Sequence, residues 1–367
     1  MPEQLTSAQI ELRELCHDFA RTVLLPQTSE DEPNRAKVRE AAKAAGLFGM
    51  TQPEQFGGQA ASQLELTIAR ETLASHNPPL MECVFGPSPG VLAEVEEPLK
   101  SSHLIPLLAG EKRGSFGFTE PDDATPTSGV EEGSNLIING QKNYVTGGGH
   151  ADFINTLVQI EGRGPSMVVV DTDLDGVVLE KRFSSLDGSH HAAFSFANVV
   201  VPQSHIIGEP GKGLPRAMRQ IGDTRLLLAA TAVGYMLWVL ELLNEHLRTA
   251  DKSGEARGNK DVVRWHYAEM RIQAYAARSM LYRTARLADS EPRVINETMA
   301  CKAFATETVE RIVDTAIQLV GGGALVEGHP LLALYKKVRA WRLAEGASDV
   351  LRLNIGRGIL ELDAGRI

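Results

Sequence analysis

Apolar residues recur at helical spacing at both ends of the chain and alternate at strand spacing in the middle. Residues 3–110 are mostly helical in pattern. Within them, four apolar residues are spaced to share one face of a helix: Ile10, Leu12, Leu15 and Phe19. The segments 52–60 and 76–90 are rich in glycine or proline, which interrupt helices, so we expect loops there.

The pattern changes after Gly114, where short β-branched or alternating runs appear. Seven candidate strands lie about ten residues apart, with glycine and aspartate turns between them. They are 115–119, 135–140, 143–148, 153–160, 166–171, 176–180 and 194–202. This spacing predicts a small β-barrel or sandwich rather than a parallel sheet.

Helical periodicity returns from Leu214 to the end, in four runs: 214–248, 261–288, 294–320 and 347–362. The order along the chain is therefore α, β, α. We expect an α+β protein, mostly α, in three domains. These are an N-terminal helical domain at 1–112, a central β domain at 113–212 and a C-terminal four-helix bundle at 213–367.

The longest apolar stretch, 226–240, is shorter than the roughly 20 residues that a membrane-spanning helix needs. Thr231 and Gly234 interrupt it, so we expect a buried core helix. The N-terminus has acidic residues every few positions and no apolar signal core. These features predict a cytoplasmic protein without a membrane anchor.

Composition is that of an ordinary globular protein, with 43% hydrophobic and 23% charged residues among 367. The 47 acidic and 37 basic residues give a net charge of −10, so no general attraction to nucleic acid or anionic lipid is expected. Cys16, Cys83 and Cys301 are far apart, which disfavours a disulfide framework or a zinc site and fits a reducing compartment.

Common catalytic motifs are missing from the sequence. The glycine-rich segments 208–213 and 321–325 match neither the dinucleotide-binding nor the P-loop spacing. His190 and His191 lack further ligands at metal spacing, so no metal site is expected. The motifs GxSxG, HExxH and CxxC do not occur, which leaves simple hydrolase and redox-thiol chemistry without support.

Six segments together carry a distinctive pattern. They are FTEP within 107–126, NGQKNYVTGG at 139–148, FANVVVPQSHIIGEPGKG at 196–213, DTRLLLAATAVG at 223–234, QLVGGGA at 318–324 and RLAEGASDV at 342–350. Each is weak alone. In this order and spacing they resemble the acyl-CoA dehydrogenases over nearly the whole chain. The resemblance implies that family's fold: an N-terminal helical domain, a central β domain and a C-terminal four-helix bundle.

The resemblance implies FAD as cofactor. A flavin ring is flat and largely apolar with a polar edge, so aromatic walls and hydroxyls at strand ends suit it. Taken alone, such residues are more often ordinary strand residues. The resemblance assigns the ring contacts to Phe116, Phe118, Thr119, Thr125, Tyr144 and Thr146.

A second group of cofactor contacts follows from the QLVGGGA segment. By resemblance, Gln318, Gly321 and Gly322 contact the adenine or pyrophosphate of FAD bound mainly by a neighbouring subunit. Glycines there let the backbone approach a phosphate closely. This implies an oligomer, either a homodimer or homotetramer or a mixed assembly with a related subunit.

Glu345 stands where the family places its catalytic base, and a base is needed to remove the α-proton of a thioester. Some members carry the base on the helix that begins here at Asp223, but Thr224 occupies that position and threonine cannot serve as a base. The resemblance assigns substrate contacts to Thr224, Arg225, Ala344 and Gly346. Burial against an acyl chain should raise the pKa of Glu345.

The reaction implied is α,β-dehydrogenation of an acyl-CoA thioester, or of an acyl group on a carrier protein. Glu345 takes the α-proton, the β-hydrogen leaves as hydride to flavin N5, and the product is the 2-enoyl thioester. An electron-transfer flavoprotein is then the expected electron acceptor.

Departures from the family pattern keep two alternatives open. Ala124, Thr125 and Pro126 replace the usual Gly-Ser-Asp, which motivates a flavin oxidase or monooxygenase of the same fold. The family's interface FAD segment is not recognisable at 248–261, where Arg248 or Arg257 could substitute. This second departure motivates a base-deficient structural subunit of a mixed oligomer.

Overall fold

The computed structural model describes residues 4–291, 294–363 and 365, which form two compact units. The first unit holds the chain up to Met50, then Ala60–Phe85, then everything described from Gly222 onward. The second holds Thr51–Gln59 and Gly86–Ile221. Both helical ends of the chain thus share one unit, and the β segment belongs to the other. The order α, β, α is confirmed, whereas the three domain boundaries stay a prediction.

The N-terminal helices of the first unit begin at capping residues. They are α1 (Ser7–Phe19), α2 (Glu32–Ala44) and α3 (Gln63–Ala74), with η1 (Ala20–Leu24), η2 (Phe48–Thr51) and η4 (Met81–Cys83) beside them. Thr6 and Ser62 each close a capping box with the residue three positions later, and Asp31 caps α2. Residue 3, where we placed the start of the helical pattern, lies outside the described residues.

The buried face of α1 differs from the expected one. Cys16 and Phe19 are buried and Leu12 is half-buried, so these three residues form the inward stripe. Ile10 and Leu15 are 42% and 39% exposed, so their placement on that face is wrong. The reason is geometric, because each residue turns about 100° around a helix and Leu15 therefore lies a quarter-turn away from Cys16.

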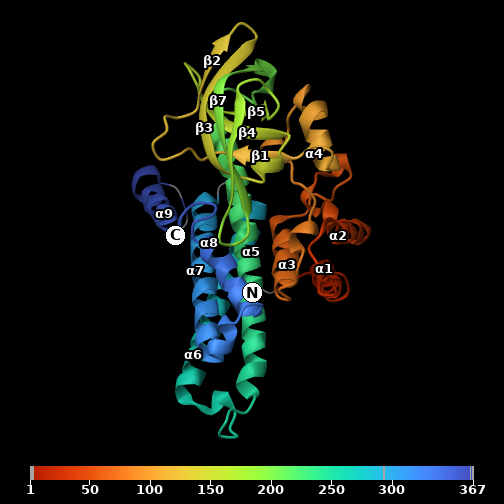
Figure 1. Cartoon of the computed structure of the whole chain (residues 1–367), viewed down its shortest axis with the longest axis vertical. Helices are drawn as coiled ribbons and strands as arrows, with labels where there is room; N and C mark the ends of the chain where they lie inside the picture. The colour runs from red at the N-terminus through yellow and green to blue at the C-terminus, as the bar shows by residue number, and fades with distance from the viewer. Residues whose placement is uncertain (1–3, 292–293, 364, 366–367) are drawn as a thin grey trace. The chain divides into compact units, whose positions relative to one another are not determined.

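Five helices supply the C-terminal part: α5 (Gly213–Arg248), α6 (Asp261–Ser290), α7 (Ile295–Val320), α8 (Pro330–Ala340) and α9 (Ser348–Leu362). The four predicted runs are confirmed, and α8 is a helix that the sequence analysis did not identify. In the first unit α6, α7 and α8 lie alongside the part of α5 that begins at Gly222 (Figure 1) and share a hydrophobic core with it. Short 3₁₀ turns, η9 (Arg257–Asn259) and η10 (Gly322–Leu325), stand between them.

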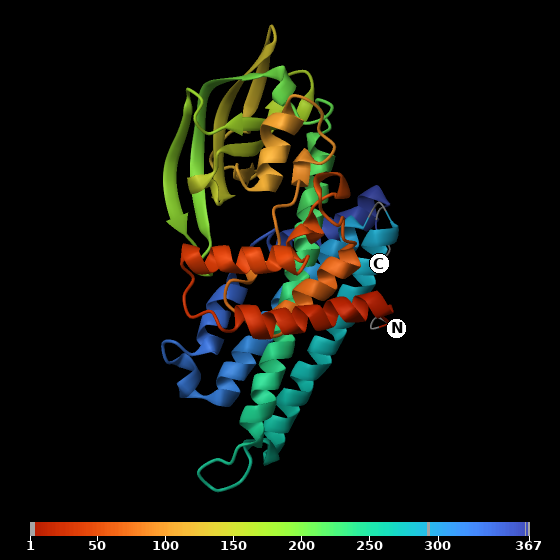
Figure 2. The same cartoon turned by 90° about the vertical axis from the view of Figure 1, so that its right-hand side faces the viewer.

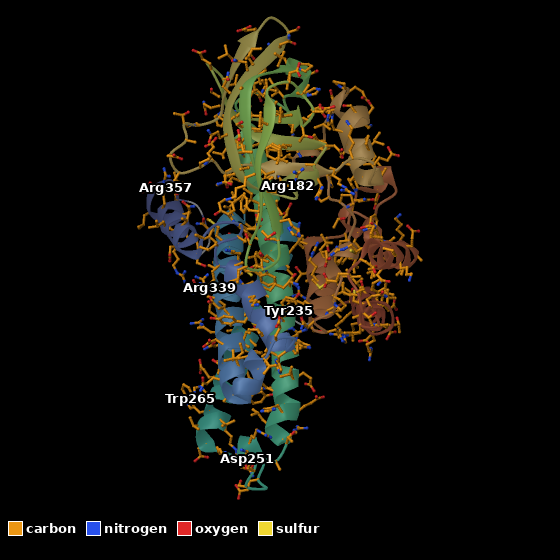
Figure 3. The ribbon with its side chains drawn as sticks, in the orientation of Figure 1. Arg182, Tyr235, Asp251, Trp265, Arg339 and Arg357 are labelled. Carbon is orange, nitrogen blue, oxygen red and sulfur yellow. The ribbon has the colours of Figure 1, made fainter. Side chains whose placement is uncertain are left out.

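The apolar stretch of α5 lies in the core, as expected. Leu226, Val233 and Met236 are fully buried and pack in one cluster with residues of α1, α3, α6, α7 and α8. Tyr235, labelled in Figure 3, is also fully buried. By length and composition α5 passes the test for a membrane span, but 67% of its most apolar window is buried inside the structure, as in a core helix.

The second unit is built around a curled sheet. Its strands are β1 (Gly114–Gly117), β2 (Ser128–Glu132), β3 (Asn135–Thr146), β4 (Phe153–Ile160), β5 (Gly164–Asp171), β6 (Val177–Ser184) and β7 (His190–Pro202). The order is β1-β4-β2-β3-β7-β6, with β5 also paired to β4. Among the described strands, the β1–β4 and β2–β4 pairs are parallel and the others antiparallel, so the expected β-barrel-like domain is confirmed.

Two strand predictions needed correction. The run 135–140 and the first four residues of the run 143–148 belong to one strand, β3, whose pairing with β7 shifts between Lys142 and Val145. β2 was missed because its sequence, SGVEE, is mostly polar and lacks the expected alternation. The apolar side chains of the sheet form a cluster around Ile138, Ile154 and Phe194.

Short helices cover part of the second unit. They are η5 (Gly90–Leu92), η6 (Lys100–Leu104) and α4 (Ile105–Ala109), with η3 (Glu54–Phe56) in the expected loop at 52–60. Leu104 and Leu108 pack with Phe153 and Met167 of the sheet. Figure 2 shows α4 beside the sheet. The turns η7 (Gly148–His150) and η8 (Gln203–His205) follow β3 and β7.

Candidate active site

Glu345 lies in the turn between α8 and α9 of the first unit. The turn requires left-handed backbone at two successive residues, with φ of 55° at Glu345 and 98° at Gly346. Glycine adopts such a value without strain, whereas glutamate does so rarely. The turn is closed by the Ser348 amide, which donates to the Arg342 carbonyl at 2.9 Å.

Two cationic side chains hold the backbone of this turn. Arg225 of α5 donates from Nε to the Glu345 carbonyl oxygen at 2.9 Å. Lys302 of α7 donates from Nζ to the Gly346 carbonyl oxygen at 2.7 Å. Arg225 is 7% exposed and Lys302 is fully buried. Two helices distant in sequence, α5 and α7, therefore hold the carbonyls of Glu345 and Gly346, and charged donors make strong hydrogen bonds.

The electrostatics of the turn combine burial with charge. Burial raises the pKa of Glu345, and the charges of Arg225 and Lys302 oppose that rise. Burial lowers the pKa of Lys302 to about 8, assisted by Arg225 and opposed by Glu345 and Glu307. Burial also lowers the pKa of Arg225, opposed by Glu345. A carboxyl group whose pKa is raised in this way is suited to accept a proton.

The predicted substrate contacts fall around this turn. Arg225 donates a hydrogen bond to the turn, and Gly346 is part of the turn. Thr224 is exposed one residue before Arg225, and Ala344 is exposed one residue before Glu345. Lys302 was not identified from the sequence. Its signal was a lysine within the apolar segment MACKAFA, where a charged residue must find a buried partner.

The second predicted cofactor segment lies at the C-terminal end of α7. Gln318 and Gly322 are exposed and Gly321 is half-buried. Gly321 has a φ of 87°, and a Cβ added at Gly321 or Gly322 would meet nothing within 4 Å. Gln318 is roughly 24 Å along the helix axis from Lys302, at 1.5 Å per residue. The first unit therefore does not bring Gln318 together with Glu345.

In the second unit, the end of β1 is fastened to β3. The Asn143 amide donates to the Thr119 carbonyl at 2.8 Å. Lys142 donates from Nζ to Glu120 Oε1 at 2.7 Å and to the Phe118 carbonyl at 3.3 Å. The Lys142 side chain is fully buried, and Glu120 also accepts from the Thr127 amide at 2.8 Å. The exposed Thr119 is thus held between two fixed neighbours.

The Glu120–Lys142 pair is coupled electrostatically. Burial alone would raise the pKa of Glu120, but the bonds from Lys142 and Thr127 hold it below its ordinary value. Burial lowers the pKa of Lys142, and Glu120 opposes that change. Breaking this ion pair would leave the remaining charge without a partner, which is costly. The pair therefore holds the segment after β1 against β3.

The predicted ring-contacting residues differ in how they are presented. Phe116 and Phe118 stack at 5.9 Å between ring centroids and pack against the apolar cluster around Phe153. Thr125 is exposed in the loop before β2. Tyr144 is 58% exposed and has a φ of 52°, at the point where β3 and β7 lose register.

Tyr144 and Thr146 form an exposed polar and aromatic surface at the end of β3. The Tyr144 ring meets the edges of Phe183 and His191, with centroids 5.3 and 5.8 Å away. Thr146 Oγ1 lies 3.2 Å from His191 Nδ1, and the Thr146 carbonyl accepts from Ser115 at 3.0 Å. From the sequence, His191 was interpreted as a turn residue rather than a metal ligand, and its place beside Thr146 was missed.

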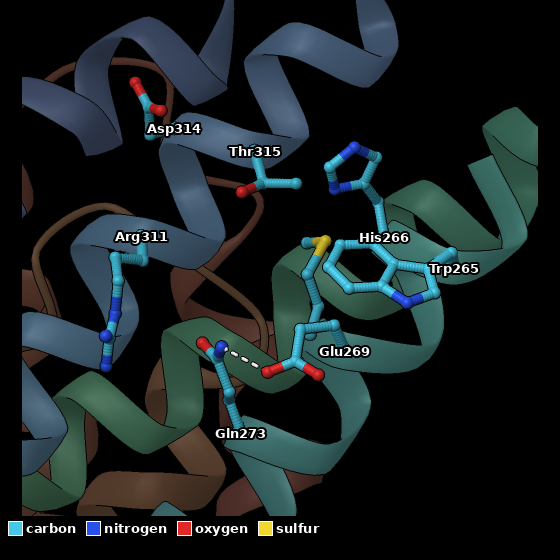
Figure 4. Close-up of a pocket in the computed structure, with 8 residues that line it drawn as sticks. Trp265, His266, Glu269, Gln273, Arg311, Asp314 and Thr315 are labelled. Carbon is cyan, nitrogen blue, oxygen red and sulfur yellow. Dashed lines mark hydrogen bonds between the residues drawn. The ribbon is translucent and has the colours of Figure 1, made fainter. Parts of the chain in front are cut away.

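Two surface hollows of the first unit contain none of the predicted site residues. One, of about 220 Å³, lies between α6 and α7 and is lined by Trp265, Glu269, Gln273 and Arg311 among others. Figure 4 shows it, with Gln273 donating to Glu269 at 2.7 Å. The other, of about 330 Å³, is lined by ion-paired residues such as Glu310 and Arg342. Among residues 4–291, 294–363 and 365, no three His, Cys, Asp or Glu side chains gather as a metal ion would require.

Comparison with known proteins covers almost the full chain. Residues 6–111, 115–199 and 211–360 match the models for the acyl-CoA dehydrogenase N-terminal, middle and C-terminal domains. A probable acyl-CoA dehydrogenase of Bacillus subtilis (strain 168) is 27% identical, covering 98% of this chain and 99% of its own. An acryloyl-CoA reductase (NADH) of Anaerotignum propionicum is 25% identical, and the match covers 98% of this chain and 96% of the reductase. A crystal structure of a probable acyl-CoA dehydrogenase from Mycobacterium abscessus superposes with a TM-score of 0.86 at 25% identity, covering 96% and 99%.

Proposed function

Because the chain belongs to the acyl-CoA dehydrogenase family, we propose that it removes the α- and β-hydrogens of an acyl-CoA thioester, with Glu345 as the base that takes the α-proton. The protein is an oxidoreductase of this family and uses FAD. The observation that carries the proposal is the fixed turn, in which Arg225 donates to the Glu345 carbonyl and Lys302 donates to the Gly346 carbonyl. The 2-enoyl thioester is the product.

The second unit has residues that fit a flavin. A tyrosine ring 58% exposed, with exposed hydroxyls at Thr119 and Thr146, offers a flat face beside polar groups at strand ends. Thr119 and Thr146 are proposed to bind the reactive edge of the ring, and Tyr144 its face. Bound FAD supplies a ring that accepts two electrons. Phe116, Phe118 and Thr125 complete the proposed contacts, and the open glycines Gly321 and Gly322 with Gln318 are proposed to contact the adenine or pyrophosphate.

The role of Glu345 follows from its environment. Burial raises the pKa of the carboxyl group, so the Glu345 carboxylate is a stronger base than the carboxylate of a solvated glutamate. The positive charges of Arg225 and Lys302 oppose that rise in pKa. Thr224, Arg225, Ala344 and Gly346 are proposed to border the substrate because they surround this carboxyl group in sequence or by contact.

Partners and location are part of the proposal. An electron-transfer flavoprotein is proposed as acceptor, the protein is proposed to act in lipid or fatty acid metabolism in the cytoplasm, and its assembly is proposed to be a homo-oligomer. The acyl group could be carried by CoA or by a carrier protein. These points follow from the family and from the exposed Gln318 and Gly322, which suit contact with a cofactor held by another copy.

One experiment tests the proposal directly. The purified holoprotein is mixed anaerobically with linear, branched and ring-bearing acyl-CoAs while the flavin absorbance is followed. Bleaching by at least one of them, with release of the 2-enoyl product, is the expected result. A flavin that stays oxidised with every acyl-CoA, while oxygen is consumed with another substrate, would favour the oxidase alternative. A colourless protein that cannot be reconstituted with FAD would refute both enzyme functions.

A further inference from the structure

A chain of hydrogen bonds runs from Thr146 to a carboxylate within the second unit. Thr146 at the end of β3 is the register partner of His191 on β7, and Thr146 Oγ1 lies 3.2 Å from His191 Nδ1. His191 Nε2 lies 2.9 Å from Ser189 Oγ. Ser189 Oγ in turn donates to Asp187 Oδ1 at 2.6 Å. The Asp187–Thr146 chain therefore links four side chains, in the spatial order Asp187, Ser189, His191 and Thr146.

Asp187, at one end of the chain, sets the direction of every hydrogen bond in it. An ionised carboxylate can only accept, so the single hydroxyl hydrogen of Ser189 goes to Asp187. Ser189 Oγ must then accept from His191, which places the ring hydrogen of neutral His191 on Nε2. His191 Nδ1 is left with a lone pair and accepts the hydroxyl hydrogen of Thr146. Thr146 Oγ1 consequently has only lone pairs to offer to anything else.

This direction requires a neutral imidazole. Burial lowers the pKa of His191 below its ordinary value of 6.5; Asp187 opposes the change and His190 adds to it. The titratable groups facing the ring are Asp187 and His190 from the same turn and strand, and Tyr144 from β3. Phe183 of β6 contributes an apolar ring at 5.5 Å. His191 is therefore neutral at pH 7.

We infer that the Asp187–Thr146 chain fixes Thr146 as a hydrogen-bond acceptor and so favours the reduced flavin ring over the oxidised one. The inference rests on the proposed function, in which Thr146 binds the reactive edge of the ring. The reactive nitrogen of the oxidised ring has a lone pair and no hydrogen, whereas in the reduced ring it carries a hydrogen. A hydroxyl oxygen that can only accept makes a hydrogen bond to this nitrogen in the reduced ring. In the oxidised ring the two lone pairs face each other and repel. His191 is thus a positioning residue that raises the reduction potential of the cofactor.

The reduction potential of the bound flavin is the measurement that tests this. His191→Phe keeps a ring against Tyr144 and Phe183 but frees the Thr146 hydrogen to point at the flavin. We expect the variant to lose about tenfold in its preference for reduced over oxidised flavin, which corresponds to a potential about 30 mV lower for a two-electron couple. His190→Phe is the matched control, since His190 Nδ1 contacts Ser184 instead, and its potential should equal that of wild type.

A double-variant cycle separates the hydroxyl from other effects. In the Thr146→Val background, His191→Phe should no longer change the potential, because the hydroxyl through which it acts is gone. The difference between wild type and His191→Phe should also vanish below the pKa of His191, because a protonated imidazole donates from both nitrogens and releases the Thr146 hydrogen. Ser189→Ala provides a second variant of the chain, with a smaller shift in the same direction.

The outcomes distinguish the inference from the proposed function. If Thr146→Val changes the potential but His191→Phe and Ser189→Ala do not, the inference is wrong and Thr146 keeps its proposed contact. If none of the three variants changes the reduction potential, Thr146 does not contact the reactive edge of the flavin. The inference and the proposed role of Thr146 are then both wrong. If the protein binds no FAD, the inference and the proposed function fail together.

Discussion

Lys302 and Glu345 are 43 positions apart in the sequence. Even so, the Lys302 ammonium donates to the carbonyl of Gly346, the residue after Glu345, at 2.7 Å. The lysine side chain is fully buried in α7, where a charge without a partner would be costly. The bond therefore serves both residues: it satisfies the lysine and holds the turn from which the Glu345 side chain extends.

Replacing Glu345 by glutamine tests the base. Glu345→Gln keeps the size of the side chain but removes the proton acceptor. We expect the rate of anaerobic flavin bleaching by a productive acyl-CoA to fall by at least about 100-fold, the lower range for loss of a general base. FAD content, measured by absorbance of the purified protein, should be unchanged. Turnover retained at the wild-type rate would exclude Glu345 as the base.

Replacing Lys302 by methionine tests how the turn is held. Lys302→Met keeps an apolar chain in the core but removes the donor to Gly346. We expect kcat to fall about 10- to 100-fold through misplacement of Glu345, because displacements near 1 Å have costs of that size. The acid limb of the kcat/KM profile should move to higher pH, since a positive charge near the carboxyl group is lost.

Lys336→Met on α8 is the matched control for that variant, because Lys336 is an exposed lysine whose replacement leaves the turn intact. Its kcat and pH profile should equal those of wild type. An unchanged pH profile in Lys302→Met would show that the lysine has a purely structural role.

Stability should depend on pH through Lys302. Its pKa is lowered from 10.5 to about 8 in the folded protein, so between these values the unfolded chain binds more protons. Stability contributed by this group therefore rises as pH increases from about 8 to 10.5, by on the order of 3 kcal/mol, since one pKa unit is about 1.4 kcal/mol. Urea unfolding of wild type relative to Lys302→Met across this range measures the effect. A difference that is flat with pH would contradict it.

Two glycines of the same region should respond oppositely to alanine. Gly346→Ala puts a side chain at φ of 98°, where its Cβ would meet Leu351 Cδ2 at 3.0 Å and Arg225 Nη2 at 3.2 Å. We expect a loss of about 1–3 kcal/mol in the free energy of unfolding. Gly356→Ala in α9 meets nothing within 4 Å and should gain up to about 1 kcal/mol from helix propensity. Urea midpoints of the two variants provide the comparison.

The buried ion pair of the second unit offers a further test. Lys142→Met leaves Glu120 without its ammonium partner and removes the donor to the Phe118 carbonyl. We expect a loss of about 2–3 kcal/mol in unfolding free energy, below the range for fully buried pairs because Glu120 is 27% exposed. FAD affinity, measured by titration of the apoprotein, should also fall through displacement of Thr119. Lys212→Met, at an exposed loop position, should change neither quantity.

The alternation of helical and strand patterns was sufficient to predict most elements. The four C-terminal runs and the buried stretch of α5 were recovered because long amphipathic segments carry a strong periodic signal. β2 and α8 were missed because they are short and one is polar. Ile10 and Leu15 were placed on the wrong face because helical spacing alone does not say which neighbour a helix packs against.

The sequence by itself determined the family, through six ordered segments, and through that resemblance it assigned Glu345 as the base and Arg225 and Gly346 as substrate contacts. Tertiary structure alone decided that Lys302 holds the Gly346 carbonyl, and that His191 pairs with Thr146. Both contacts join residues more than 40 positions apart. Such pairings depend on how helices and strands pack, and local spacing along the chain contains no record of them.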